Sequence, residues 1–205
     1  MTDARVLGVI LAGGASKRFG ANKALAALQS KPLLAHVAAR AAPQVDQLVL
    51  NAASDVAATG LTLVPDHVPG EGPLGGWLAG LHWAAEQGFP LLATFACDTP
   101  HFPPDTVARL TAALADGADF AMARHDNQVH HTFALLRTSR RDCLEEAYAS
   151  GMRRLRAVGG VLRCALPDFS DCRDGPNGDA FFNINTPNDL ALFEAWLQNH
   201  GRDLQ

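Results

Sequence analysis

Short apolar segments alternate with longer stretches of helical periodicity in the first half of the chain. The segments with the continuous apolar character of buried strands are Val6–Ile10, Gln47–Leu50, Leu61–Val64 and Leu91–Ala96. Apolar residues recur at helical spacing over Pro32–Ala42, Leu74–Gln87 and Pro104–Ala115. Because strands that alternate with helices pair side by side in one direction, this pattern predicts an α/β fold with a parallel sheet.

Beyond about residue 118 the alternation becomes less regular. Strand-like segments occur at Phe120–Ala123, Phe133–Leu136 and Val161–Ala165, and helical patterns occur at Arg140–Ala149 and Asn188–Gln198. Residues 167–179 are rich in Pro, Gly, Asp and Asn, which predicts a loop. We therefore expect some antiparallel strands in the C-terminal half. Since nothing in the 205 residues has the composition of a linker, we expect one domain over residues 1–205.

The composition limits the classes of protein that the chain can belong to. Its hydrophobic content of 48% is enough for a sizeable core, and its formal net charge of -4 argues against a general nucleic-acid binder. The N-terminus lacks the pattern of a signal peptide, and no apolar run approaches the length of a membrane span. We expect a soluble, cytoplasmic protein without nucleic-acid or membrane partners.

Cysteine and histidine spacing does not suggest a metal centre. Cys97, Cys143, Cys164 and Cys172 are widely spaced, without a C-x-x-C pair. His130 and His131 are adjacent, and neighbours on a strand point to opposite faces. We expect ordinary thiols, and histidines that do not share a metal ion.

The segment Leu11–Lys23 places three glycines and three cations directly after the first strand. Gly13 and Gly14 allow backbone N–H groups to turn toward an anion, while Arg18 can bind phosphate as a planar fork and Lys23 as a mobile point charge. The spacing differs from both the Walker A loop and G-x-G-x-x-G, so ordinary kinases, ATPases and dehydrogenases are disfavoured. The segment indicates a phosphate site; the alternative is a loop corner with solvated charges.

Polar residues follow the other predicted strands. Asn51, Asp66 and Asp98 come directly after strands two, three and four, where ligands of open α/β sheets bind. Asp98 precedes Thr99-Pro100, which can hold the carboxylate outward, and Mg²⁺ accompanying a nucleoside triphosphate takes one or two carboxylates as ligands. Asp98 is our first choice as that metal ligand, and a strand-ending Asx turn is the alternative.

A second glycine-rich segment, residues 69–76, precedes the helix expected from Leu74. Glycine there permits close approach of a flat base or a phosphate to the backbone. A flexible surface loop would explain Gly70 and Gly72 more easily than the pair Gly75-Gly76 inside a helix start, where glycine is unfavourable.

These motifs together resemble one enzyme family. Leu11–Lys23 is similar to the signature L-A-G-G-x-S-x-R-M-G-x-x-K, with Phe19 in place of the usual Met. The resemblance continues through Lys31–Leu33, Pro65–Asp66, Gly72–Gly76, Cys97–Pro100 and Asn183–Leu190. On these residues the chain resembles the molybdenum cofactor guanylyltransferase (MobA) family of nucleotidyltransferases from end to end. Related cytidylyltransferases usually carry Ala-Ala-Gly at Ala12-Gly13-Gly14, so the paired glycines favour a guanylyl enzyme.

The resemblance implies both a fold and a reaction. The fold is a three-layer α/β/α, Rossmann-like fold of the nucleotide-diphospho-sugar transferase type, with a GTP-binding N-terminal half and an acceptor-binding C-terminal half. The reaction transfers GMP from GTP to the terminal phosphate of molybdenum-molybdopterin, giving the guanine dinucleotide cofactor and pyrophosphate. The implied metal is Mg²⁺ or Mn²⁺. Transient contacts with cofactor-pathway proteins and with recipient molybdoenzymes or their chaperones are also implied.

The resemblance also assigns roles to individual residues. Arg18, Lys23 and Asp98 are expected to act in catalysis, with Asp98 holding the metal. The residues expected at the nucleotide are Leu11, Ala12, Gly13, Gly14, Lys23, Asn51, Asp66, Gly75 and Asp98. The residues expected at the acceptor are Arg153, Arg154, Asn183 and Asn185. The alternatives for the acceptor set are asparagines that cap the last helix and arginines on a solvated face.

Other functions remain open on the sequence. A cytidylyltransferase for the same cofactor, or for a sugar or polyol phosphate, would share the first signature. A non-catalytic carrier of the cofactor would also keep the nucleotide-binding fold.

Overall fold

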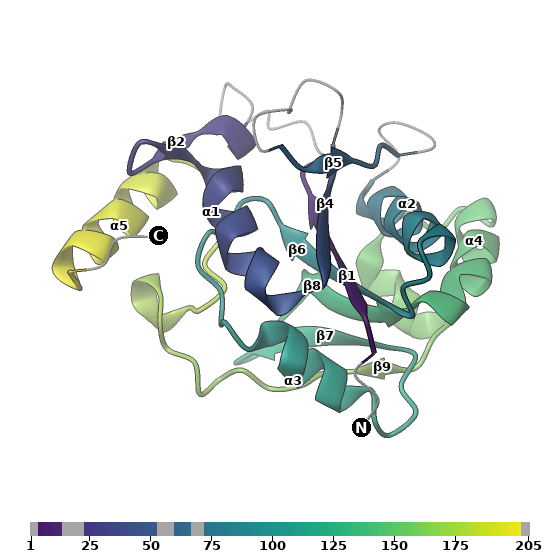
Figure 1. Cartoon of the computed structure of the whole chain (residues 1–205). Coiled ribbons are helices and arrows are strands. Elements are labelled where there is room, and N and C mark those ends of the chain that lie inside the picture. Colours follow the sequence, from purple (N-terminus) through teal and green to yellow (C-terminus); the bar gives the residue numbers. More distant parts are fainter. Residues whose placement is uncertain (1–3, 14–22, 53–59, 67–71, 202–205) are drawn as a thin grey trace.

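A twisted seven-stranded sheet forms the centre of the molecule in the computed structural model, which describes residues 4–13, 23–52, 60–66 and 72–201 (Figure 1). The strands of this sheet, in spatial order, are β5 (Thr62–Leu63), β4 (Gln47–Asn51), β1 (Val6–Leu11), β6 (Leu91–Ala96), β8 (Gln128–Arg137), β7 (Phe120–His125) and β9 (Cys164–Ala165). The α-helices are α1 (Leu33–Ala41), α2 (Pro73–Glu86), α3 (Thr106–Ala113), α4 (Arg141–Ala149) and α5 (Pro187–Asn199). Short 3-10 helices are η1 (Lys23–Leu25), η2 (Ala42–Gln44), η3 (Thr138–Arg140), η4 (Leu155–Gly160) and η5 (Pro176–Gly178).

The direction of the strands changes in the second half of the chain. β1 pairs in parallel with β4 on one side and with β6 on the other. β8 is antiparallel to both of its neighbours, β6 and β7, and β9 pairs in parallel with β7. The expected parallel sheet with antiparallel strands in the C-terminal half is confirmed.

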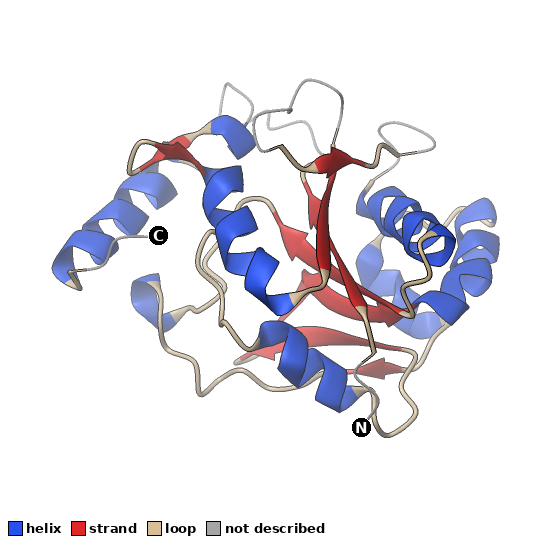
Figure 2. Cartoon of the chain, viewed as in Figure 1, coloured by secondary structure: helices blue, strands red, loops and turns tan. Residues whose placement is uncertain are grey.

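Helices cover both faces of the sheet and complete three layers (Figure 2). Side chains of β1 alternate between these faces, as a strand buried on both sides requires. Val6 and Ile10 join the apolar cluster that packs under α1 and α3. Leu7 and Val9 join the cluster that packs under α2 and α4. The α/β/α architecture is therefore confirmed, and it directs the carboxyl ends of β4, β1 and β6 to one edge.

A small hairpin precedes α1 that the apolar pattern does not predict. β2 (Ala27–Leu28) and β3 (Lys31–Pro32) pair antiparallel around Gln29 and Ser30, which both have positive φ. Leu28 and Leu33 pack with Phe193 of α5 in a third apolar cluster. The hairpin therefore anchors the C-terminal helix to the rest of the fold.

Two other elements differ from the expectation in length. β8 begins at Gln128, five residues before the expected start at Phe133, because it pairs with β7 through a bulge after Met122. The strand expected over Val161–Ala165 contains only Cys164–Ala165, since η4 ends at Gly160 and Val161 follows in a turn. Both differences lie among the strands β8, β7 and β9 on one side of the sheet.

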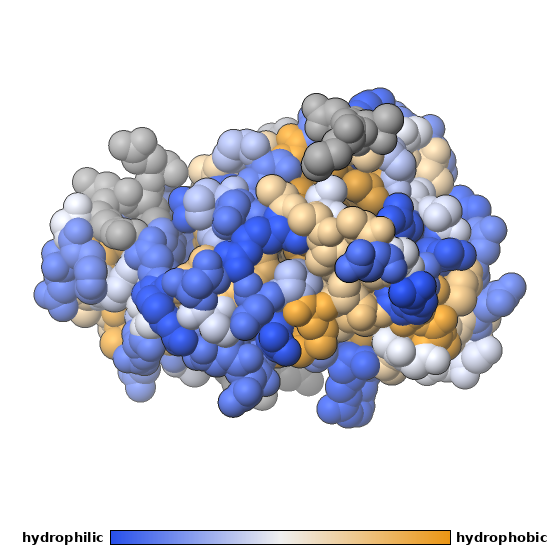
Figure 3. All heavy atoms as spheres, turned by 90° about the horizontal axis from the view of Figure 1, so that it is seen from below, coloured by the Kyte–Doolittle hydropathy of each residue, from blue (hydrophilic) through white to orange (hydrophobic). Residues whose placement is uncertain are grey.

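Figure 3 shows the molecule from below, the side opposite the carboxyl ends of the parallel strands. Hydrophilic residues dominate this face, and apolar residues appear in smaller groups among them. Among the residues that the structure describes, no helix combines the length and apolar character that a membrane span requires.

Candidate nucleotide-binding site

The carboxyl ends of three parallel strands meet at one edge of the sheet. Leu11, the last residue of β1, pairs with Asn51 of β4 and with Ala96 of β6. The N–H group of Ala12 donates to the Asn51 carbonyl at 2.8 Å, and that of Cys97 donates to the Leu11 carbonyl at 3.4 Å. This pairing places the residues that follow the strands beside one another.

Asn51 and Asp66 form a hydrogen-bonded pair at this edge. Nδ2 of the buried Asn51 side chain donates to Oδ1 of Asp66 at 2.7 Å and to the Val64 carbonyl at 2.9 Å. These two bonds use both hydrogens of the Asn51 amide. Asn51 therefore fixes the Asp66 carboxylate, which is half-buried, and presents it at the edge.

The start of α2 lies against this pair because its residues are glycines. A Cβ atom on Gly76 would lie 2.5 Å from Oδ1 of Asn51, closer than carbon and oxygen can approach. A Cβ atom on Gly75 would lie 3.5 Å from Oδ2 of Asp66, an ordinary contact distance. Gly72 at the N-cap has a φ of 88°, which a residue with a side chain rarely adopts. The glycine pair thus brings the N-terminal amides of α2 next to Asp66.

Asp98 lies just beyond the end of β6 and is connected to the Asn183 segment. Its carbonyl accepts a hydrogen bond from the Ile184 N–H at 2.9 Å. The Thr99 hydroxyl lies 3.4 Å from Oδ1 of Asp98 and donates to Oδ1 of Asn183. Two sequence motifs separated by more than eighty residues therefore meet at Asp98 and Thr99.

The other predicted acceptor residues take separate positions. The backbone N–H of Asn185 donates to Oδ2 of Asp189 at 2.9 Å, as part of the capping arrangement that starts α5. Nη1 of Arg153 donates to the Tyr148 carbonyl at 2.6 Å, and its guanidinium stacks 4.0 Å from the Tyr148 ring centroid. The Arg153 carbonyl lies 3.3 Å from where a Cβ of Gly72 would be, so Arg153 adjoins the start of α2. Arg154 is exposed.

Part of the predicted site lies outside the described residues. Gly14 and Arg18 fall in the segment between Gly13 and Lys23, and the Lys23 side chain likewise lies outside the described part, although its backbone begins η1. Gly13 is exposed at the end of β1, and a Cβ there would lie 3.7 Å from Oδ1 of Asn51. Of the predicted nucleotide residues, the structure brings together Leu11, Ala12, Gly13, Asn51, Asp66 and Gly75.

The donors at this edge fit a magnesium ion that is held mainly by its nucleotide. Within the described ranges, no group of three or more His, Cys, Asp or Glu side chains could hold a metal ion. Mg²⁺ at a triphosphate needs only one or two carboxylates, because the phosphates and water supply the remaining oxygens. Asp98 provides one half-buried carboxylate directly beyond a parallel strand. The residue set therefore fits a shared ion and does not fit a closed protein cage.

An open, mainly parallel sheet with a glycine-lined helix start and a carboxylate at its carboxyl edge defines a nucleotide-binding α/β protein. Comparison with known proteins shows which family within this class the chain belongs to. The chain belongs to the family described as the MobA-like NTP transferase domain, whose model matches residues 8–164. It is therefore a nucleotidyltransferase, and the family predicted from its motifs is confirmed.

Individual relatives match over nearly the whole chain. A molybdenum cofactor guanylyltransferase from Bradyrhizobium sp. is 39% identical over 211 residues, which cover 98% of each chain. One from Rhodobacter capsulatus is 40% identical over 202 residues, covering 96% of this chain and 98% of the relative. The crystal structure of molybdopterin-guanine dinucleotide biosynthesis protein A from Archaeoglobus fulgidus superposes with a TM-score of 0.75 at 25% identity, covering 94% of this chain and 99% of that one.

Two contributors to this geometry are absent from the site predicted by the sequence. Thr99 is predicted only as part of a turn, whereas its hydroxyl connects Asp98 with Asn183. Tyr148 is not among the predicted residues, although its hydroxyl lies 3.8 Å from where a Cβ of Gly75 would be. Thr99 could have been predicted as a site residue because it is polar and adjoins the predicted metal ligand Asp98. No local sequence pattern indicates Tyr148.

Proposed function

We propose that this enzyme transfers GMP from GTP to the terminal phosphate of molybdenum-molybdopterin and releases pyrophosphate. The observation that carries the proposal is the position of Asp98, which lies beside the nucleotide edge and is also bonded to the Asn183–Ile184 segment. A group in that position can act on a donor and an acceptor at once. The names of the relatives supply the substrates.

The proposed reaction needs alignment and charge neutralisation more than proton transfer. An acceptor phosphate monoester is mostly ionised near neutral pH, so its oxygen is already a nucleophile. That oxygen forms a bond to the α-phosphorus of GTP, and the bond from this phosphorus to the bridging oxygen breaks as pyrophosphate leaves. Arg18 and Lys23 are proposed to offset the negative charge that develops on the α-phosphate and the leaving group.

Asp98 is proposed to hold the metal ion that accompanies GTP. A bound Mg²⁺ supplies Lewis-acid stabilisation of charge on the phosphate oxygens. Asp98 keeps its orientation through the Ile184 N–H on its carbonyl and the Thr99 hydroxyl beside its carboxylate. Asn183 and Asn185, with Arg153 and Arg154, remain our proposed contacts for the acceptor.

Asp66 is proposed to read the guanine base. Guanine presents N1–H and N2–H₂ as adjacent donors, and a carboxylate can accept from both. Because Asn51 donates to Oδ1 of Asp66, the carboxylate is fixed before the base arrives. Gly75 leaves room next to Oδ2 of Asp66, where a side chain would compete with the base.

Nucleotide choice is the direct test of the reaction. The protein is incubated with Mg²⁺, molybdenum-molybdopterin and each of the four nucleoside triphosphates, and pyrophosphate release is measured. We expect GTP to support release that the other three do not match. Equal or better use of CTP would overturn the guanylyl assignment in favour of a cytidylyltransferase.

The substitution Asp98→Asn tests the catalytic role. We expect kcat to fall by at least about 100-fold while GTP binding persists, because the change removes a charged ligand and keeps the size of the side chain. The matched control is Asp116→Asn, a loss of the same charge at an exposed position away from this edge. A wild-type protein that binds GTP and the cofactor but releases no pyrophosphate would support a carrier.

A further inference from the structure

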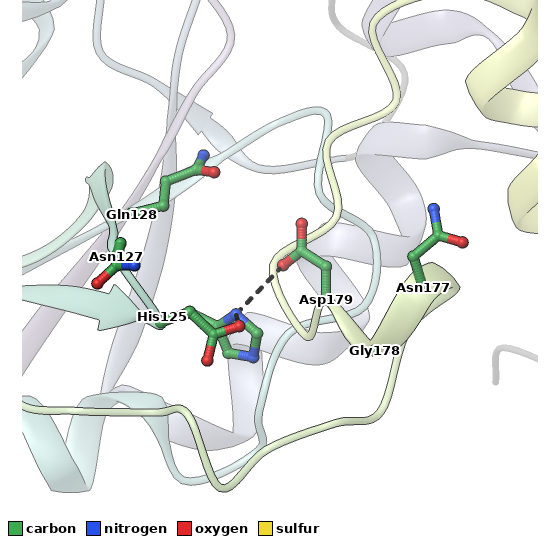
Figure 4. Close-up of a pocket in the computed structure, with 7 residues that line it drawn as sticks. His125, Asn127, Gln128, Asn177, Gly178 and Asp179 are labelled. Atoms are coloured by element: carbon green, nitrogen blue, oxygen red, sulfur yellow. Dashed lines mark ion pairs between the residues drawn. The ribbon is translucent and has the colours of Figure 1, made fainter.

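A polar pocket of about 410 Å³ lies between the β7–β8 turn and the η5 turn (Figure 4). Residues 125–128 of the hairpin form one wall, and residues 177–179 form the other. In Figure 4 the Asp179 carboxylate stands between the hairpin side chains and Asn177, with a dashed line to His125. Carboxylate, amide and imidazole groups from two distant parts of the chain thus face one space.

This pocket lies on the same edge of the sheet as Asp98. Because β8 runs antiparallel to β6, with Thr94 opposite Ala134, the start of β8 lies beyond the carboxyl end of β6. The other wall leads directly into the segment bonded to Asp98, since the Ile184 N–H donates to the Asp98 carbonyl. The five-residue step from Asp179 to Ile184 spans at most about 18 Å. The pocket therefore lies within reach of the Asp98 segment along the chain.

Asp179 presents an acceptor that the protein leaves open. Its Oδ1 accepts a hydrogen bond from the Phe181 N–H at 2.9 Å and lies 3.9 Å from Nδ1 of His125. Within the part of the chain that the structure describes, its Oδ2 has no hydrogen-bond partner, and the side chain is 34% exposed. The carboxylate is thus oriented through one oxygen and offers the other to the pocket.

A cluster of stacked rings follows both walls of the pocket along the chain, at His130 and at Phe181. His130 stacks on Phe181 with ring centroids 4.7 Å apart, and Phe181 also contacts the rings of Phe133 and Phe169. Nε2 of His130 is buried without a hydrogen-bond partner in the described structure.

We infer that this pocket binds the pterin ring of the acceptor, with the Asp179 carboxylate accepting hydrogen bonds from its 2-amino group and the adjacent ring N–H. This inference rests on the proposed function, which requires an acceptor that carries a pterin and a phosphate. The 2-amino-4-oxopyrimidine edge of a pterin presents two neighbouring donors, which match one carboxylate. Asn127, Gln128 and Asn177 add amides that can donate to the ring oxygen and nitrogens.

Guanine presents the same donor edge as a pterin, so the test must separate the two. Binding of a free 6-substituted pterin is measured by quenching of its fluorescence, with and without a saturating concentration of GTP. Lumazine, which has an oxo group in place of the 2-amino group, serves as the comparison ligand. We expect the pterin to bind in both conditions and lumazine to bind at least 10-fold more weakly, because lumazine lacks the 2-amino donor and presents a carbonyl oxygen to the carboxylate in its place.

The substitution Asp179→Asn tests whether the Asp179 carboxylate binds the pterin. The amide oxygen can still accept from the Phe181 N–H, but its NH₂ group then faces the donors of the pterin. We expect the pterin Kd and the KM for molybdenum-molybdopterin to rise about 10- to 100-fold, while GTP binding and the lumazine Kd stay unchanged. Asp116→Asn is the matched control, since it removes the same charge at an exposed site outside the pocket.

Several results would overturn the inference. They are absence of pterin binding to the wild-type protein, equal binding of lumazine, loss of pterin binding when GTP saturates the protein, and an unchanged pterin Kd in Asp179→Asn. These outcomes are distinct from failure of the proposed function, because pterin binding needs no turnover. A protein that transfers GMP while Asp179→Asn keeps the wild-type KM would retain the proposed function and lose only this pocket assignment.

Discussion

At the level of single residues, Gly76 allows the close packing of α2 against the sheet. Its missing side chain lets α2 approach β1 and β4, since a Cβ would lie 2.5 Å from Oδ1 of Asn51 and 2.9 Å from Cδ2 of Leu11. We expect Gly76→Ala to lower the free energy of unfolding by about 1–3 kcal/mol, because the methyl group overpacks a buried contact. Urea denaturation measures the loss, and a GTP titration measures the accompanying rise in Kd as the Asn51–Asp66 pair shifts.

Two other glycines provide comparisons for this change. A Cβ at Gly75 would make only ordinary contacts with Asp66, so Gly75→Ala should keep stability while it weakens GTP binding. A Cβ at Gly159 would point into open space, and Gly159→Ala should change neither quantity. Equal stability of Gly76→Ala and Gly159→Ala would contradict the close packing of α2 on this edge.

At the level of elements, the cap of α5 holds the segment that connects to Asp98. The Thr186 hydroxyl accepts from the Asp189 N–H at 3.2 Å, and Oδ2 of Asp189 accepts from the Thr186 N–H at 2.8 Å. We expect Thr186→Ala to lower the free energy of unfolding by about 1 kcal/mol, because the Asp189 N–H at the helix start loses its side-chain acceptor. Thermal and urea denaturation measure the effect.

Thr111→Ala is the matched control for the cap. The Thr111 hydroxyl donates to the Val107 carbonyl within α3, a bond that does not cap a helix, and alanine is the better helix former. This variant should be as stable as the wild type or slightly more stable. A Thr186→Ala protein that is no less stable than Thr111→Ala would show that the cap does not hold α5.

The elements differ in how far the sequence predicts them. β1 and β6 are predictable because each is a short run, mostly apolar, that is buried throughout, and α2 because its apolar positions repeat at helical spacing. The β2–β3 hairpin is not predictable, since each strand has two residues and its turn uses Gln29 and Ser30 at positive φ in place of the usual Asn-Gly.

The candidate site likewise contains features that the sequence predicts and features that it does not. Asp66 and Asp98 are predictable as candidates because each directly follows a strand, where α/β sheets bind ligands. The Asn51–Asp66 bond and the Thr99–Asn183 bond are not, because they depend on which strands become neighbours. The pocket around Asp179 requires two turns about fifty residues apart to meet, which no local pattern predicts. The roles assigned to Arg18 and Lys23 stay predictions.

At the scale of the whole molecule, β8 joins the parallel strands of the sheet to the β7–β8 hairpin. The parallel strands place the Asn51–Asp66 pair on one side of Asp98, and the antiparallel pair β7–β8 places the Asp179 pocket on the other. The aromatic cluster of His130, Phe133 and Phe181 packs β8 against the segment that follows η5. Because a buried charge is unfavourable, protonation of His130 within this cluster should lower the stability of the fold.

The titration of His130 should make the free energy of unfolding depend on pH. Burial lowers the pKa of His130 from 6.5 to about 4, with the Asp179 charge opposing this shift and His125 and His131 adding to it. Between these two pH values the unfolded chain binds a proton on His130 that the folded protein does not, so the contribution to stability present above pH 6.5 is lost as the pH falls. At pH 5 the loss amounts to about 2 kcal/mol.

The substitution His130→Phe isolates this contribution from the other histidines. Phenylalanine keeps an aromatic ring on Phe181 and cannot take up a proton, whereas His36 and His131, whose pKa values are also lowered by burial, remain in both proteins. Urea denaturation at pH 7.5 and pH 5 gives the change in unfolding free energy for each protein. We expect the change to be smaller in His130→Phe by about 2 kcal/mol. Equal changes in the two proteins would mean that His130 titrates normally and that the ring cluster is open to water. The comparison uses the pH dependence of each protein, so a difference in their stability at pH 7.5 does not affect the conclusion.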